Sequence, residues 1–140
     1  MESESAFERN EAVVLTFDPE LGALLLGERG AEFRWPSNDA VRKIDRIEHD
    51  VGPRWVWWTA ETARHLVDAG IQPARCWDLD AVHRLIHGGW RAGPARSWAG
   101  AHDLDVDQLP TVAPIDLFTA AAEVDGADPD DPIRSDGHLD

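Results

Sequence analysis

A short tryptophan-rich run limits the folds that are open to this chain. Residues 55–58 (WVWW) are four consecutive apolar side chains with no polar residue between them. A strand with one wet face alternates polar and apolar residues, whereas a continuous apolar run is typical of a central strand covered on both faces. Gly52-Pro53 precedes the run and separates it from the residues before it. We therefore expect a layered α/β fold built around this strand.

Two helices are expected after this strand, each with its own start and stop signal. Thr59 can cap a helix over about residues 60–69, which Gly70 is suited to end. Asp78 can cap a second helix after a short extended stretch at residues 75–77. The side chains expected to face the core are Ala63, Leu66, Val67 and Ile71 for the first helix, and Ala81, Val82, Leu85 and Ile86 for the second.

The residues before the tryptophan-rich run predict a small antiparallel sheet. Apolar runs at residues 12–17 and 23–26 flank a turn-rich pentapeptide, which is typical of a hairpin. A third strand is expected at residues 31–35, followed by a helix at residues 39–49. The expected N-cap of that helix is Ser37 or Asn38. The whole pattern is α/β and compatible with a ribonuclease-H-like sheet.

Composition divides the chain into three parts. Residues 1–11 form a polar lead-in, residues 12–109 one domain, and residues 110–140 an acidic linker or tail. The lead-in and the tail are expected to be disordered. The net charge is −14, and residues 103–140 carry eleven acidic side chains against one arginine, so the rest is only mildly acidic. The charge of the domain itself therefore neither favours nor excludes a nucleic-acid partner.

Two further features bear on location. No run of about 18 apolar residues exists, and no charged segment precedes an apolar one, so neither a membrane span nor a signal peptide is expected. The single cysteine, Cys76, precludes an internal disulfide and fits a reducing compartment. The sequence therefore predicts a cytoplasmic protein without a membrane partner.

Two segments carry a resemblance to a known family. The stretch PRWVWWTAETARHLVDAGI, from residue 53, is followed by RCWDLDAVHRLIHG, from residue 75. Gly70-Ile71 marks a turn, and Trp77-Asp78 marks a short strand followed by a helix. The known family has these elements in the same order. Over residues 53–104 the chain resembles the N-terminal exonuclease-like domain of actinobacterial family-A DNA polymerases, which are bifunctional 3′–5′ exonuclease/DNA polymerases. The resemblance implies a ribonuclease-H-like partial domain, a fragment of a longer protein that acts in DNA replication and repair, with a polymerase core in cis and Mg²⁺ in the full-length enzyme.

The residues that would perform exonuclease chemistry do not match that family. Its active members hold two metal ions with four carboxylates, because several hard anionic oxygens are needed to bridge two divalent cations. The family's helix aspartate falls at Thr62, and the only Asp-x-Glu, Asp18-Pro19-Glu20, lies in an expected turn. The late tyrosine of the family motif has no counterpart, since the chain contains no tyrosine. We therefore expect a catalytically degenerate domain with no catalytic residue, metal ligand or cofactor of its own.

One stretch has the composition of a nucleic-acid surface. Residues 74–102 hold four arginines against two aspartates and interleave them with tryptophans, as stacking and phosphate-contacting surfaces do. The candidate DNA-binding residues are Arg75, Arg84, Arg91, Arg96, Trp90 and Trp98. The same pattern also fits buried tryptophans with arginine stems packed over them.

Three other sets of residues could have a catalytic or metal-binding role, but each also fits a purely structural one. Asp80, His83 and His87 lie on one helix face and could share a zinc ion, but they also fit a solvated polar face. Cys76 could be a nucleophile, although a small buried hydrophobic residue is the more common role. Asp18 and Glu20, with Glu61, could support residual metal-dependent nuclease activity, whereas Asp-Pro is a frequent turn former. The alternative to the polymerase hypothesis is a free-standing acidic protein-interaction domain without a nucleic-acid role.

Overall fold

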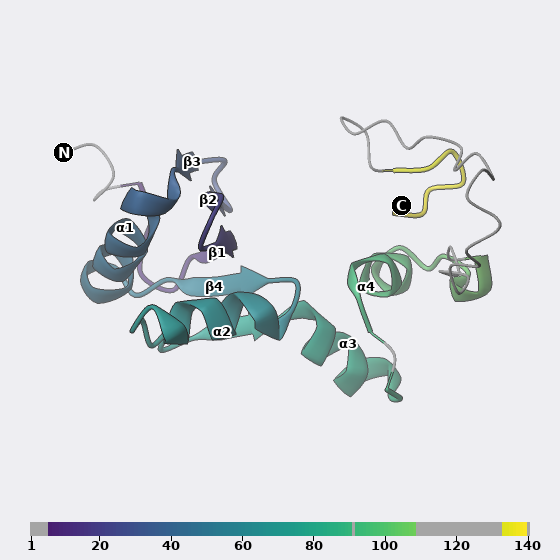
Figure 1. The fold of residues 1–140 in the computed structure, drawn as a ribbon. Coiled ribbons are helices and arrows are strands. Elements are labelled where there is room, and N and C mark those ends of the chain that lie inside the picture. The colour runs from purple at the N-terminus through teal and green to yellow at the C-terminus, as the bar shows by residue number, and fades with distance from the viewer. Residues whose placement is uncertain (1–5, 91, 109–132, 140) are drawn as a thin grey trace, which may run out of the picture.

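The described residues form a mixed five-stranded sheet with four α-helices (Figure 1). The computed structural model describes residues 6–90, 92–108 and 133–139. The strands are β1 (Ala12–Asp18), β2 (Gly22–Gly27), β3 (Glu32–Trp35), β4 (Arg54–Trp57) and β5 (Cys76–Asp78). The helices are α1 (Ser37–Asp50), α2 (Ala60–Asp68), α3 (Leu79–His87) and α4 (Pro94–Ala101), with a 3₁₀ turn η1 (Val106–Gln108). The expected α/β class is confirmed.

The strand order in the sheet is β3-β2-β1-β4-β5. β1, β2 and β3 form an antiparallel meander, and β4 and β5 are added in parallel beside β1. Helices α1 and α2 make the two crossovers that the parallel strands require, and they pack on β2 and β1 respectively. The expected hairpin, third strand and helix before the tryptophan-rich run are all present.

The core lies between one face of the sheet and the helices α1 and α2. Its largest fully buried side chain, Trp55 of β4, donates its Nε1–H to Glu48 Oε2 of α1 at 2.7 Å. Glu48 Oε1 accepts the backbone N–H of Ala74 at 2.9 Å, so one carboxylate links α1 to β4 and to the loop before β5. The other core residues are Phe7, Val13, Leu15, Phe17, Ala23, Leu25, Ala40, Ile44, Ile47, Trp57, Leu66 and Ile71.

The prediction that β4 is covered on both faces is wrong. The register of the sheet places Val14, Leu26, Val56 and Trp77 in one row on the face opposite the core. Val14 is 42% exposed and Leu26 45% exposed, because α1 and α2 both lie on the other face. The run of apolar residues in β4 therefore reflects an open apolar sheet face rather than a second helical layer among the described residues.

The lead-in is partly folded, contrary to the sequence expectation. Phe7 is 4% exposed and packs edge-on against Phe33 of β3, with ring centroids 5.5 Å apart. Glu11 Oε2 accepts the backbone N–H of Glu8 at 2.7 Å and a guanidinium N–H of Arg29 at 3.0 Å. An aromatic anchor and a charge-assisted hydrogen bond thus attach residues 6–11 to the β2–β3 turn, while residues 1–5 lie outside the described part of the chain.

Acid is expected to weaken this attachment. The hydrogen bond from the Glu8 N–H lowers the pKa of Glu11 below its ordinary value of 4.5. Burial acts in the opposite direction, and the Arg29 guanidinium lowers the pKa further. A carboxylate whose pKa falls on folding stabilises the fold above its unfolded pKa, and that stability is lost as the pH falls through the folded pKa. Urea unfolding between about pH 6 and pH 3 should therefore show a shallower loss of stability in Glu11→Gln than in the parent chain. The same substitution at Glu20 is the control, and equal slopes for the parent and Glu11→Gln would contradict the assignment.

The predicted helix ends are largely confirmed. The Thr59 hydroxyl accepts the N–H of Glu61 at 3.3 Å at the start of α2, and Gly70 follows the helix with φ of +84°. Asp78 Oδ1 accepts the N–H of Ala81 at 2.9 Å and caps α3. The cap expected for α1 is wrong, because that helix begins at Ser37 with Pro36 as its N-cap and no side-chain cap.

Five of the expected burials are wrong, those of Val67, Cys76, Ala81, Leu85 and Ile86. Val67 of α2 is 59% exposed, although Leu66 and Ile71 are buried as expected. Cys76 is exposed, because β5 is an edge strand. Leu85 and Ile86 of α3 are 86% and 71% exposed.

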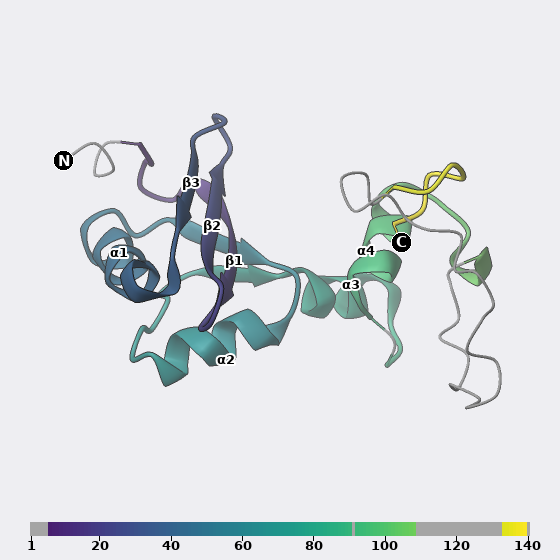
Figure 2. The same ribbon diagram turned by 45° about the horizontal axis from the view of Figure 1, so that its top comes forward.

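The exposure of α3 follows from its position. Figures 1 and 2 show α3 and α4 beyond the end of the sheet, where α3 has no strand to cover. Within the described residues α3 packs against α4 through the side that carries Asp80 and His83. The apolar stripe of α3 therefore faces away from both the sheet and α4.

The last described residues fold back on α4. Residues 133–139 form a tight turn closed by a bridge between Ile133 and Leu139. The Trp98 Nε1–H of α4 donates to the carbonyl of Gly137 at 3.0 Å, and His138 is 2% exposed. These residues thus differ from the unpacked tail expected from the sequence, while residues 109–132 lie outside the described part of the chain.

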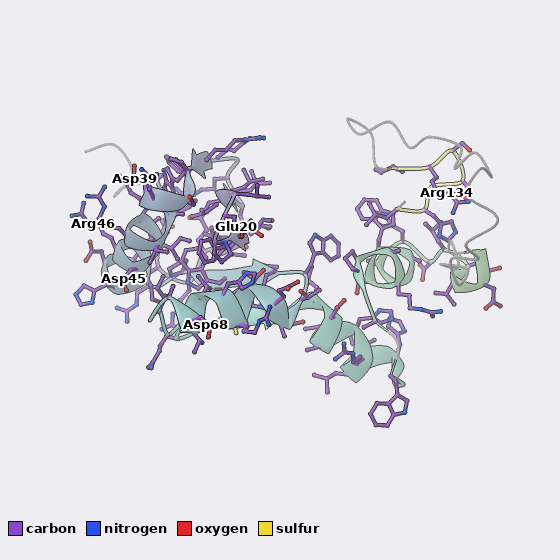
Figure 3. The ribbon with its side chains drawn as sticks, in the orientation of Figure 1. Glu20, Asp39, Asp45, Arg46, Asp68 and Arg134 are labelled. Carbon is purple, nitrogen blue, oxygen red and sulfur yellow. The ribbon has the colours of Figure 1, made fainter. Side chains whose placement is uncertain are left out.

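The outer surface of α1 is charged. Figure 3 shows Asp39, Asp45 and Arg46 projecting from α1 away from the sheet. Asp39 accepts an N–H of Arg42 at 2.6 Å, an exposed pair worth little to stability. No helix among the described residues is long and apolar enough to cross a membrane.

Candidate nucleic-acid interface

Helices α3 and α4 enclose a pocket at the end of the molecule beyond the sheet. The cavity has a volume of about 510 Å³. We call it the α3–α4 pocket. It is lined by His83, His87, Gly88, Gly89, Trp90, Arg96, Gly100 and Val106. Its functional groups are thus two imidazoles, one indole and one guanidinium.

The two histidines of this pocket come from successive turns of α3. Their ring centroids lie 4.6 Å apart, with the planes inclined by 40°. Burial and then the charge of His87 lower the pKa of His83, and Arg96 acts in the same direction while Asp80 opposes it. The lowered pKa favours the neutral form of His83, which has an unshared electron pair on one ring nitrogen.

Trp90 is the most exposed aromatic side chain of the described residues. It follows the Gly88-Gly89 pair that ends α3 and is 96% exposed. Arg96, half-buried in α4, lines the same pocket. A fully presented indole beside a guanidinium is the combination that nucleic-acid surfaces use, stacking on a base and contacting a phosphate.

The structure places five of the six candidate DNA-binding residues, and they lie in four different regions. Trp90 and Arg96 share the α3–α4 pocket, and Arg84 lies exposed on α3. Trp98 faces the C-terminal turn and lies against His102, with ring centroids 4.2 Å apart and the planes inclined by 34°. Arg91 lies outside the described residues.

Arg75 lies elsewhere, before β5. Its guanidinium donates to the side-chain oxygen of Asn10 and to the carbonyl of Gly52 at 3.4 Å. The cavity it lines also contains Glu48 and Asp50. These contacts give Arg75 a structural role at the junction of the lead-in, α1 and β5, apart from the α3–α4 pocket.

The sequence left two interpretations open for His83 and His87, with Asp80, as ligands of a zinc ion or as part of a solvated polar face, and it could not place them in this pocket. The i, i+4 spacing on α3 was a visible signal. The other half of the signal is Gly100 of α4, which leaves room for both rings. Only the packing of α3 on α4 shows that this glycine faces the pair.

The acidic residues considered for metal-dependent chemistry do not come together. Asp18 ends β1, and its Oδ1 accepts the N–H groups of Leu21 and Glu20 at 2.9 and 2.7 Å, which lower the pKa of Asp18. Glu61 of α2 accepts an N–H of Arg64 at 3.1 Å. No three His, Cys, Asp or Glu side chains converge on one point in the part of the chain that the structure describes.

The chain was compared with known proteins. No protein-family model matches it, and neither a curated protein nor a solved structure does. A proposal for its function therefore rests on the residues of the chain itself.

Proposed function

We propose that this chain is a catalytically degenerate exonuclease-like domain of a bacterial family-A DNA polymerase. It would act in the cytoplasm, in DNA replication or repair, as a scaffold with weak DNA contact. The sequence resemblance over residues 53–104 is the starting point for this proposal. The strand order supports it, since an antiparallel meander followed by two parallel strands is compatible with a ribonuclease-H-like sheet.

Catalytic degeneracy is supported by the positions of the carboxylates. Asp18 is engaged as a turn former and Glu61 as an ion-pair partner, on different elements. Thr62 stands at the helix position where the resembled family has an aspartate. These residues do not fit a pair of bridged magnesium ions, which need several shared carboxylate oxygens. Any Mg²⁺ chemistry is proposed for a polymerase core and not for this domain.

Contact with a polymerase core in cis is supported by exposed apolar surface. Leu85 and Ile86 present an apolar stripe on α3. Trp77, Val14 and Leu26 present another on the open face of the sheet. Contiguous apolar surface of this kind commonly marks a protein–protein contact.

DNA contact is carried by one observation, the exposed Trp90 beside Arg96 in the α3–α4 pocket. A single-stranded base can stack on the indole while the guanidinium meets the neighbouring phosphate. The net charge of −14 opposes DNA binding through long-range repulsion. We therefore expect weak binding that is visible only at low ionic strength.

Fluorescence anisotropy of a labelled primer-template at two salt concentrations tests this function. The chain should bind at low salt, and Trp90→Ala should weaken binding by about 5- to 100-fold, the range for loss of one stacked base. Arg96→Ala should weaken binding and reduce its salt dependence. Arg42→Ala, which removes an exposed arginine of α1 away from the pocket, is the matched control. Equal effects of Arg96→Ala and Arg42→Ala would argue against the pocket as the DNA site.

The alternative function is a free-standing acidic protein-interaction domain. Its support is the strong negative charge combined with the exposed apolar stripes. Absence of DNA binding even at low salt would favour this alternative. The same protein incubated with Mg²⁺ or Mn²⁺ and single-stranded DNA should leave the DNA intact, and degradation would contradict catalytic degeneracy.

A further inference from the structure

The geometry between α3 and α4 points to a transition-metal site. We propose that His83 and His87 together bind one divalent ion of the class that prefers imidazole, with Zn²⁺ as its representative. This proposal is independent of DNA contact, because it depends only on the two rings and the glycine opposite them.

The two rings face a common point. A Cβ atom built on Gly100 would lie 3.2 Å from Nδ1 of His83 and 3.2 Å from Nε2 of His87. Two nitrogens from different turns of α3 thus lie close to one position beside α4. A half-turn of the His83 ring would place its Nε2 where Cε1 lies, 3.1 Å from the same point, so either ring orientation presents a nitrogen there.

The space at that point exists because α4 carries glycine there. Gly100 is helical and has no positive φ, so its backbone does not require glycine. Alanine would be the better helix former by about 1 kcal/mol. The absence of a side chain at residue 100 therefore coincides with the position where the two imidazoles converge.

The two imidazole nitrogens determine which class of metal ion the site would prefer. Neutral imidazole nitrogen is a ligand for Zn²⁺, Cu²⁺ and Ni²⁺, whereas Mg²⁺ and Ca²⁺ prefer oxygen. Among the described residues no donor or acceptor is hydrogen-bonded to the ring of His83 or His87. Side-chain rotations of the two imidazoles must bring each nitrogen to the usual zinc distance of about 2.0–2.1 Å from the ion, which would lie farther from the α4 backbone than a Cβ of residue 100.

Two histidines supply only half of a tetrahedral zinc site. Since no third His, Cys, Asp or Glu converges there within the described residues, the other coordination positions remain for water or an anionic oxygen. The charges nearby are of opposite sign, Asp80 and Arg96, and both act on His83. The site is therefore weaker than a closed structural zinc site and open to exchange.

Isothermal titration of the full chain with ZnCl₂ tests the proposal. One equivalent should bind, MgCl₂ should not compete, and both His83→Ala and His87→Ala should weaken binding by at least about tenfold, because each removes one of two ligands. Gly100→Ala keeps both imidazoles but adds a methyl group about 3.2 Å from a nitrogen of each ring, which leaves less room for an ion there and should weaken binding to a similar extent. His49→Ala, which removes an exposed histidine of α1, should leave binding unchanged.

Circular dichroism separates loss of the site from loss of the fold in each variant. The proposal is overturned if folded His83→Ala and His87→Ala bind Zn²⁺ as the parent does, or if the parent binds none at about 100 µM. It is also overturned if folded Gly100→Ala retains full affinity, since binding would then not use the space that Gly100 leaves beside the two rings. Loss of DNA binding in Trp90→Ala would not bear on any of these outcomes.

Discussion

Replacing Trp55 with alanine is expected to unfold most of the molecule at moderate urea concentration. Trp55 is fully buried in the middle of the core and is hydrogen-bonded to Glu48 at 2.7 Å. Truncation of a buried tryptophan to alanine costs about 3–5 kcal/mol, and it leaves Glu48 without this partner. A domain of this size has a total stability of about 5–15 kcal/mol, so the loss is a large fraction. Urea unfolding followed by circular dichroism gives the change in midpoint.

Trp77→Ala is the matched control, because it removes the same side chain from the neighbouring strand. Trp77 is 49% exposed on the open sheet face, so its loss should cost no more than about 1 kcal/mol. Trp55→Phe keeps an aromatic ring in the core but removes the hydrogen bond, and it should cost about 1–3 kcal/mol because Glu48 Oε2 loses its donor. Similar midpoints for Trp55→Ala and Trp77→Ala would show that the core is not centred on β4.

The sequence predicted those features that depend on neighbouring residues. Thr59, Gly70 and Asp78 start and stop helices through contacts with backbone groups a few residues away, so their roles could be read locally. The hairpin between β1 and β2 is equally local, since Asp18 closes the turn by accepting two N–H groups. The fold class followed from the order of these elements.

The sequence could not show which surfaces are covered. Val56 and Leu85 have the composition of core residues, yet one lies on the open face of the sheet and the other on a helix beyond its end. Whether an apolar stripe is buried depends on a partner element that is distant in sequence or in another chain. The candidate site shows the same limit, because Gly100 meets His83 only after α4 folds back on α3.

Replacing Gly22 with alanine is expected to separate β3 from β2. Gly22 has φ of +117°, where an L side chain is strained. In addition, its Cβ would lie 2.1 Å from the carbonyl oxygen of Trp35 and 3.1 Å from Pro36. Both contacts are with backbone, so the start of β2 or the end of β3 must move. The combined cost should be about 3 kcal/mol or more, measured as a fall in the urea midpoint.

Gly30→Ala isolates the contribution of the backbone angle alone. Gly30 has φ of +84° in the β2–β3 turn, and a Cβ there would meet nothing within 4 Å. Its substitution should therefore cost only the left-handed penalty, about 1–2 kcal/mol. The difference between the two variants measures how tightly the end of β3 is held against the start of β2. If both variants lose the same stability, the edge of the sheet can move to accommodate the added Cβ. The close approach of Gly22 to the Trp35 carbonyl would then not stabilise the fold.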